Sequence, residues 1–261
     1  MCCFSGPVGA VTSTRIFARP SGGPKQIVVY QMNVRAPSDV AMILPLPVAD
    51  GATESSIRFI SLQDYPDFFV DLNQGWREYD APIPGALSIG GAPALVVHDV
   101  GDFEASFAPS LADLARLDER FQIPPVAWQA VPDVDNRGFA VFKLRGLSAN
   151  ASKTPHPMAF EFTRRDSASL CFPTLHIHDG EFHPTARFDH ILYAQTGRKE
   201  DPHMDGPAGD EYCEEDDAVE HCVDLVRAAG TVQPGATVYR QIRFGEHPNA
   251  DITLTLAGSD R

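Results

Sequence analysis

The stretch that decides the fold class runs from Gln26 to Val48 and reads QIVVYQMNVRAPSDVAMILPLPV. Both of its arms, Gln26–Val34 and Val40–Val48, are β-rich runs, and turn-forming residues at 36–39 separate them. This pattern predicts two strands joined as a hairpin. Pro45 and Pro47 cannot donate a hydrogen bond to a neighbouring strand, so we expect that end of the second strand to lie at a sheet edge or to leave the sheet.

Outward from this stretch the chain consists mainly of further strand candidates. They are 15–18, 94–100, 103–107, 139–144, 158–163, 169–178, 190–195, 237–244 and 251–256. Three helices are predicted, at 66–73, 110–121 and 216–229. The second begins at Ser110 and carries apolar residues on one stripe, and the third places Cys222 and Val226 on its apolar stripe. The sequence therefore predicts an α+β fold, mainly β, with two packed antiparallel sheets and two or three short helices.

We expect residues 1–261 to form a single compact domain, because no segment has the composition of a linker. A weak internal echo leaves open a division into two related β halves, about 1–108 and 137–261, joined by the helix at 110–121. In this echo a β-run ending in Leu-Pro-Leu-Pro is followed, after residue 137, by runs ending in Phe172-Pro173-Thr174-Leu175.

The composition limits the class of partner. The chain is 43% hydrophobic and 21% charged, which is typical of a soluble globular protein, and its net charge is −14. We therefore expect neither nucleic acid nor a membrane as a partner, and the partner is a small molecule or a protein of unknown identity. No apolar run is long enough to span a bilayer, and no secretory signal is evident. These features predict a cytoplasmic protein whose five cysteines are thiols or metal ligands.

Four of the nine histidines crowd into the segment Leu175–His190, LHIHDGEFHPTARFDH. His176 and His178 are two residues apart at the end of a strand candidate, so their imidazoles are expected on the same face. A turn at Asp179-Gly180 would fold His183 back beside them, and His190 opens the next strand candidate. Converging imidazoles are transition-metal ligands, so the pattern predicts a site for copper or zinc, with iron as a further candidate.

The second unusual segment is the start of the chain, Met1-Cys2-Cys3-Phe4. Cys2 and Cys3 are candidate thiolate ligands, and we expect the first strand to lie near the histidine segment and to border the same site. Glu181 or Asp189 would then be the general base of a metal-dependent enzyme. Alternatively, removal of Met1 would leave Cys2 as the nucleophile of a hydrolase, with its own amine as the base.

Several short segments resemble the opening of a bacterial family of unknown function. They are Cys2-Cys3-Phe4, Val11, Ile16-Phe17-Ala18, Tyr30-Gln31 and Met42-Ile43-Leu44-Pro45-Leu46-Pro47. Members of that family begin with a Cys-Phe motif, followed by a strand and a Leu-Pro-x-Pro segment. The resemblance covers about residues 2–174 and implies a β-rich fold, but it implies no chemistry.

Three functions therefore stay open at the level of sequence. The first is a metal-binding protein with a histidine-rich site, which could be a metal-dependent enzyme of unknown substrate. The second is a non-enzymatic β-sandwich that binds a partner. The third is a hydrolase that uses Cys2. The acidic run between Glu200 and Glu220 is typical of a solvated loop.

Overall fold

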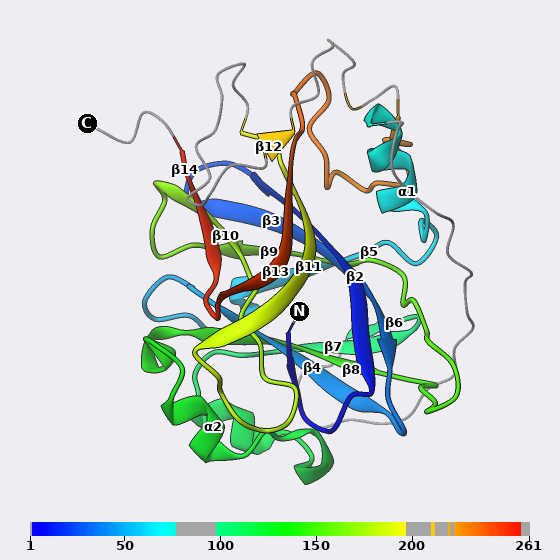
Figure 1. Ribbon diagram of the computed structural model, residues 1–261. Helices are drawn as coiled ribbons and strands as arrows, with labels where there is room; N and C mark the ends of the chain where they lie inside the picture. The colour runs from blue at the N-terminus through cyan, green and yellow to red at the C-terminus, as the bar shows by residue number, and fades with distance from the viewer. Residues whose placement is uncertain (1, 77–97, 197–209, 212–218, 220–221, 257–261) are drawn as a thin grey trace.

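The computed structural model describes residues 2–76, 98–196, 210–211, 219 and 222–256, and its two large sheets confirm the predicted fold class (Figure 1). The five-stranded sheet has the order β1 (Cys3–Phe4), β4 (Val40–Leu46), β8 (Gly138–Leu144), β7 (Phe103–Ala108) and β6 (His98–Val100). The seven-stranded sheet has the order β12 (Asp210–Glu211), β13 (Tyr239–Pro248), β11 (Thr185–Ala194), β2 (Ala10–Pro20), β3 (Lys25–Arg35), β9 (Met158–Thr163) and β5 (Ile57–Ser61). A small sheet pairs β10 (Ser169–Phe172) with β14 (Ile252–Thr255).

Strand pairing is antiparallel throughout these sheets except between β11 and β2, which run parallel. Each large sheet takes strands from both halves of the chain. β4 pairs with β8, and β3 pairs with β9.

The predicted hairpin between the two arms of Gln26–Val48 is wrong, although both strands exist. β3 belongs to the seven-stranded sheet and β4 to the five-stranded sheet, so residues 36–39 carry the chain from one sheet to the other. A turn between two apolar strands has the same local sequence pattern whether the two strands pair with each other or lie in different sheets. The prediction for Pro45 is confirmed, because among the described residues β1 pairs with β4 only at Ile43 and Met42, and Pro45 pairs with β8 alone.

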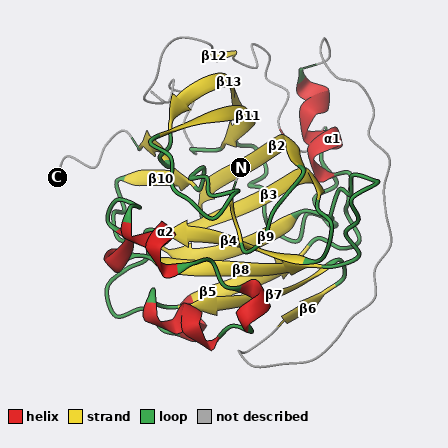
Figure 2. Cartoon of the chain, turned by 60° about the horizontal axis from the view of Figure 1, so that its bottom comes forward, coloured by secondary structure: helices red, strands yellow, loops and turns green. Residues whose placement is uncertain are grey.

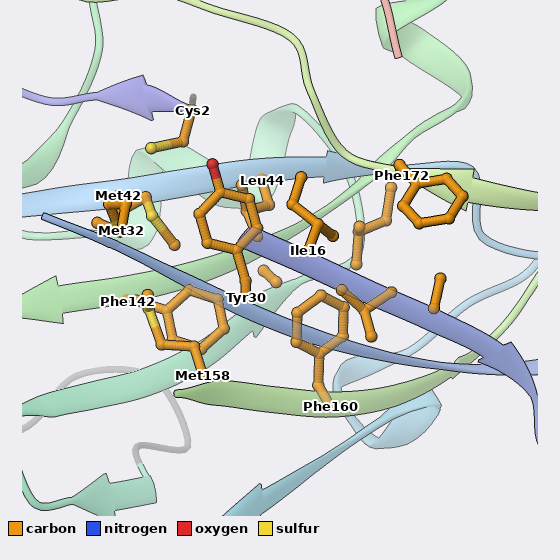
Figure 3. Packing of buried hydrophobic residues seen from close by; sticks show 14 of the residues in the cluster. Cys2, Ile16, Tyr30, Met32, Met42, Leu44, Phe142, Met158, Phe160 and Phe172 are labelled. Carbon is orange, nitrogen blue, oxygen red and sulfur yellow. The ribbon is translucent and has the colours of Figure 1, made fainter. Parts of the chain in front are cut away.

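Three apolar clusters explain why the central strands are apolar on both faces. The first fills the space between the two large sheets and includes Tyr30, Met42 and Phe160 (Figure 3). The second lies on the outer face of the five-stranded sheet under α2 (Pro125–Gln129) and the short helical turns (Figure 2). The third lies on the outer face of the seven-stranded sheet under α1 (Phe68–Leu72). A sheet covered on both faces buries consecutive residues, as Val28 and Val29 show.

The helices are shorter than predicted. Residues 110–121 form two 3₁₀ turns, η3 (Ala112–Arg116) and η4 (Glu119–Phe121), rather than one α-helix. The described part of 216–229 is a series of turns, because the Asp224 carboxylate accepts from the backbone N–H groups of Val226 and Arg227 and begins a new turn there. Val226, expected on a buried stripe, is 90% exposed. The remaining turns are η1 (Glu54–Ser56), η2 (Asn73–Gly75) and η5 (Val134–Asn136).

A buried network of ion pairs lies beside β7. The Asp102 carboxylate pairs with Lys153 at 3.0 Å and also accepts from the backbone N–H of His156 at 3.1 Å. The Glu104 carboxylate pairs with both Arg145 and Lys143. We call Asp102, Glu104, Lys143, Arg145 and Lys153 the ion-pair network.

No helix among the described residues is long and apolar enough to cross a membrane.

Candidate functional site

The N-terminal segment enters the protein interior directly. Cys2 and Phe4 belong to the apolar cluster between the sheets, whereas Cys3 belongs to the cluster on the outer face. This alternation follows from the strand conformation of β1, in which successive side chains point to opposite faces. Cys2 and Cys3 are both fully buried, and they point into different cores. Two thiols on opposite faces of one strand do not converge on a single ion.

Residues 174–178 lie alongside this segment, as we expected from the sequence. Ile177 forms a parallel bridge with Cys3, in which the Phe4 N–H donates to the Ile177 carbonyl at 2.9 Å and the Ile177 N–H donates to the Cys2 carbonyl at 3.4 Å. β10 ends at Phe172, so His176 and His178 lie in an extended segment beyond the strand. Leu175 and Ile177 face the outer core, and the two histidines therefore face the other side, like Cys2 and Phe4.

Three imidazoles stand in a row on that side. The ring centroids of His176 and His178 are 5.5 Å apart with an interplanar angle of 7°, so the expected common face is found. The ring of His190, which β11 supplies, lies 5.4 Å from His176 at an angle of 10°. We call His178, His176 and His190 the imidazole row. Phe188 packs against both His176 and His190, with centroids 4.5 and 4.6 Å away.

Burial keeps this region neutral. It lowers the pKa of His178 to about 4, lowers that of His176 further and places that of His190 well below the usual value. Burial also raises the pKa of the Cys2 thiol to about 12, and that of Cys3 well above its ordinary value. At neutral pH the row therefore consists of uncharged imidazoles beside protonated thiols.

His183 and Glu181 lie outside the row. The His183 side chain is 57% exposed, and its Nε2 lies 2.9 Å from Asp179 Oδ2. The hydrogen bond with Asp179 raises the pKa of His183. Glu181 is exposed on a bend after Gly180, and its backbone N–H donates to the Asp179 carboxylate. The turn at Asp179-Gly180 thus directs His183 and Glu181 to the surface.

Asp189 is half-buried beside a bulge in β2. Ser13 has a φ of 54°, and the β2–β3 register shifts between Thr12 and Arg15. This backbone aims the Ser13 N–H at Asp189 Oδ2, at 2.7 Å. Among the described residues, Asp189 Oδ1, Thr14 Oγ1, Tyr30 Oη and His178 Nε2 are buried without a hydrogen-bond partner. Burial raises the pKa of the Asp189 carboxyl group.

The arrangement does not resemble a metal centre. Among the described residues, no group of three or more His, Cys, Asp or Glu side chains is placed to hold a metal ion. We therefore do not identify the histidines as metal ligands, and copper, zinc or iron binding stays a prediction from the sequence. The four described cysteines, Cys2, Cys3, Cys171 and Cys222, are free thiols.

Several residues of this region carried no signal in the sequence. Figure 3 shows the Tyr30 hydroxyl pointing towards Cys2. Asn249 holds the backbone of His176 on both sides, accepting from its N–H at 2.8 Å and donating to its carbonyl at 2.9 Å. Asp251 accepts from the N–H groups of Thr174 and Leu175. The ring of His247, an unremarkable residue in the sequence, lies 5.3 Å from Phe188.

His156 is also buried, although it lies in a proline-rich loop. Its ring packs on Phe103 at 4.6 Å and accepts from the Asp102 N–H, so it belongs with the ion-pair network rather than with the imidazole row. Of the acidic run 200–220, only 210–211 and 219 fall within the described residues.

One surface cleft of about 400 Å³ lies between residues 48–52, 109–113 and 135–137. Arg165 lines it and pairs with Asp50 at 3.2 Å. None of the predicted site residues lines this cleft.

These features define a two-sheet β protein whose unusual residues lie mostly in its interior. In comparisons with known proteins, the fold matches the crystal structure of baculovirus P35, with a TM-score of 0.51 and 11% identity over 98% of this chain and 99% of that chain. A mutated baculovirus P35 after caspase cleavage matches with a TM-score of 0.49 and 10% identity, over 94% of this chain and 100% of that chain. The caspase-8/P35 complex matches with a TM-score of 0.47 and 10% identity, over 94% and 96%. No protein-family model matches the sequence, and no curated protein matches it either.

Proposed function

We propose that this chain is a non-enzymatic protein that binds a protein partner. The observation that carries the proposal is the burial of Cys2, the one residue for which the sequence suggests a catalytic nucleophile. Its thiol is fully buried and its pKa is raised to about 12, whereas catalysis by cysteine requires an accessible thiolate. The N-terminal segment acts here as part of the core.

The candidate general bases support the same proposal. The half-buried Asp189 accepts a hydrogen bond from the Ser13 N–H, and Glu181 is exposed after the Asp179-Gly180 turn. A general base must lie within hydrogen-bond reach of the group it deprotonates. Cys2, the candidate nucleophile, is fully buried, whereas Glu181 is exposed and Asp189 is held by a backbone N–H.

The choice of partner class follows from the fold. P35, whose architecture this chain shares, is found in a complex with caspase-8. We therefore propose a cysteine protease of the caspase class as the first partner to examine. The net charge of −14 favours a protein partner over a nucleic acid.

The test mixes the purified chain with active caspase-8 and measures complex formation by size-exclusion chromatography and residual activity on a fluorogenic peptide. A serine protease of similar size is the control. We expect a stoichiometric complex with caspase-8 and none with the control protease. Failure to bind caspase-8 at micromolar concentrations would contradict the proposed partner class. Turnover of ester or amide substrates that a Cys2→Ser variant loses would instead support the hydrolase and overturn the non-enzymatic proposal.

A further inference from the structure

The seven-stranded sheet exposes one of its edges along β13. Among the described strands only the two-residue β12 lies beyond β13, and it pairs with Gln241 and Arg240 (Figure 2). The rest of β13, residues 242–248, extends past β12, and most of it is exposed to solvent: Phe244, Gly245, Glu246 and Pro248. We call residues 242–248 the β13 edge.

The hydrogen bonds of β13 show which of its backbone groups face this edge. The Asn249 N–H donates to the Pro184 carbonyl at 2.9 Å, which continues the register that pairs Thr185 with Pro248. Hydrogen-bonded and non-hydrogen-bonded pairs alternate along an antiparallel ladder. The odd-numbered residues of β13 therefore bond to β11, and the N–H and C=O groups of the even-numbered residues 242, 244 and 246 point away from it.

A large apolar side chain stands in the middle of the β13 edge. Phe244 is 63% exposed, although it belongs to a strand. Ile242 pairs with Ile191, which packs against the cluster on the outer face, so Ile242 and Phe244 point to the outer face as well. Gly245 has a φ of 96°, and no atom lies within 4 Å of the position that a Cβ would take there. An open strand edge next to an exposed aromatic ring is a surface on which another strand can pair.

The β13 edge is complementary to itself. When two such stretches run antiparallel about Gly245, Phe244 of one copy lies opposite Glu246 of the other, and residue 242 lies opposite residue 248. Even-numbered residues then meet even-numbered residues, so the outward N–H and C=O groups of each stretch face those of the other. The Phe244 carbonyl, which His247 Nε2 contacts at 3.1 Å, can accept a second hydrogen bond.

We propose that two copies of this chain associate through their β13 edges and form one continuous sheet across a two-fold axis. The same patch serves on both copies, as in most closed homodimers. The two Phe244 rings lie diagonally across the axis, at a separation that aromatic side chains bridge, and each covers part of the other's exposed surface. Gly245, which has no side chain, lies on the axis. β12 limits the pairing to residues 242–248, because it occupies the edge at 240–241.

The oligomeric state of the full chain tests this proposal. Sedimentation equilibrium and light scattering measure its mass from low to high micromolar concentration, in about 150 mM salt, which screens the repulsion between two chains of net charge −14. We expect a monomer–dimer equilibrium for the wild type. Phe244→Lys places a charge at the centre of the contact and should weaken self-association by at least ~10-fold.

A matched variant separates the β13 edge from other exposed apolar positions. Val226→Lys makes the same change at a side chain that is 90% exposed on a turn outside β13, and it should associate like the wild type. Hydrogen exchange of the wild type gives a second measurement that needs no variant. Residues 242–248 should exchange more slowly at high than at low protein concentration, whereas the interior strand β3 should be unaffected. A wild type that stays monomeric at high micromolar concentration, or a Phe244→Lys variant that associates like the wild type, would overturn the proposal.

Discussion

The three imidazoles of the imidazole row are kept uncharged, whereas the buried side chains of the ion-pair network beside β7 are kept as paired ions. Burial lowers the pKa of each histidine of the imidazole row. In the ion-pair network each carboxylate meets a lysine or an arginine within the same buried region. Both solutions avoid an unpaired buried charge, but they respond differently to pH and to mutation.

The largest expected effect is a pH dependence of the free energy of unfolding that comes from the imidazole row. The unfolded chain takes up protons on these histidines below a pH of about 6.5, while the folded protein excludes them because the native pKa values are lowered. The folding free energy is therefore intact above pH 7 and declines as the pH falls, by up to about 1.4 kcal/mol per pH unit for each histidine.

Summed over the row, the loss between pH 7 and 5 reaches at most about 6 kcal/mol. Urea unfolding followed by circular dichroism at each pH measures it. A free energy of unfolding that stays constant between pH 7 and 5 would show that the folded protein does not keep these three imidazoles uncharged. The contrast between the imidazole row and the ion-pair network would then be wrong.

The next largest effect concerns the ion-pair network. Asp102→Ala leaves Lys153 buried without its carboxylate and removes the acceptor of the His156 N–H, so we expect a loss of about 3–5 kcal/mol. Thermal and urea unfolding of the variant give the value. Arg120→Ala, which removes the exposed ion pair with Asp118, is the control and should have no measurable effect. Equal effects at the two positions would contradict the distinction between buried and exposed pairs.

A smaller effect is expected for the buried thiol of Cys2. Cys2→Ser places a hydroxyl in the apolar cluster between the sheets, which costs about 1–3 kcal/mol unless the new group finds a partner. Cys222→Ser is the matched control, since Cys222 is only partly buried, and it should cost less than about 0.5 kcal/mol. Both values come from urea denaturation at pH 7.5. A Cys2→Ser variant as stable as the wild type would show that Tyr30 or another group accepts the hydroxyl.

The smallest effect is expected at His183. His183→Ala removes an exposed pair with Asp179, and we expect no measurable change in the unfolding midpoint at pH 7.5. Comparison with His176→Ala in the same assay sharpens the contrast within one histidine-rich segment. A strong effect of His183→Ala would indicate that this residue supports the row after all.

The sequence determined most of the strands, because β-branched and aromatic runs and proline positions are local properties, but it did not predict β5 (Ile57–Ser61). β3, β4, β8 and β9 fall close to their predicted ranges, and Pro45, which has no N–H to donate, lies in the part of β4 that β1 does not pair with. The sequence also predicted that His176 and His178 share one face, because residues two apart in an extended segment point the same way. It further predicted that the N-terminal strand with Cys2 and Cys3 lies beside these histidines.

Tertiary structure decided which strands pair and what the histidines face. The residues at 36–39 would fit a hairpin equally well. β4 lies in the other sheet because each of the two sheets buries its apolar face against the other. Asn249 and Asp251 hold residues 174–176 from more than 70 positions away. Neighbours at such separations leave no trace in local periodicity. For this reason the sequence indicated where the imidazoles gather, whereas their burial, and hence their charge, depended on the packing of distant segments.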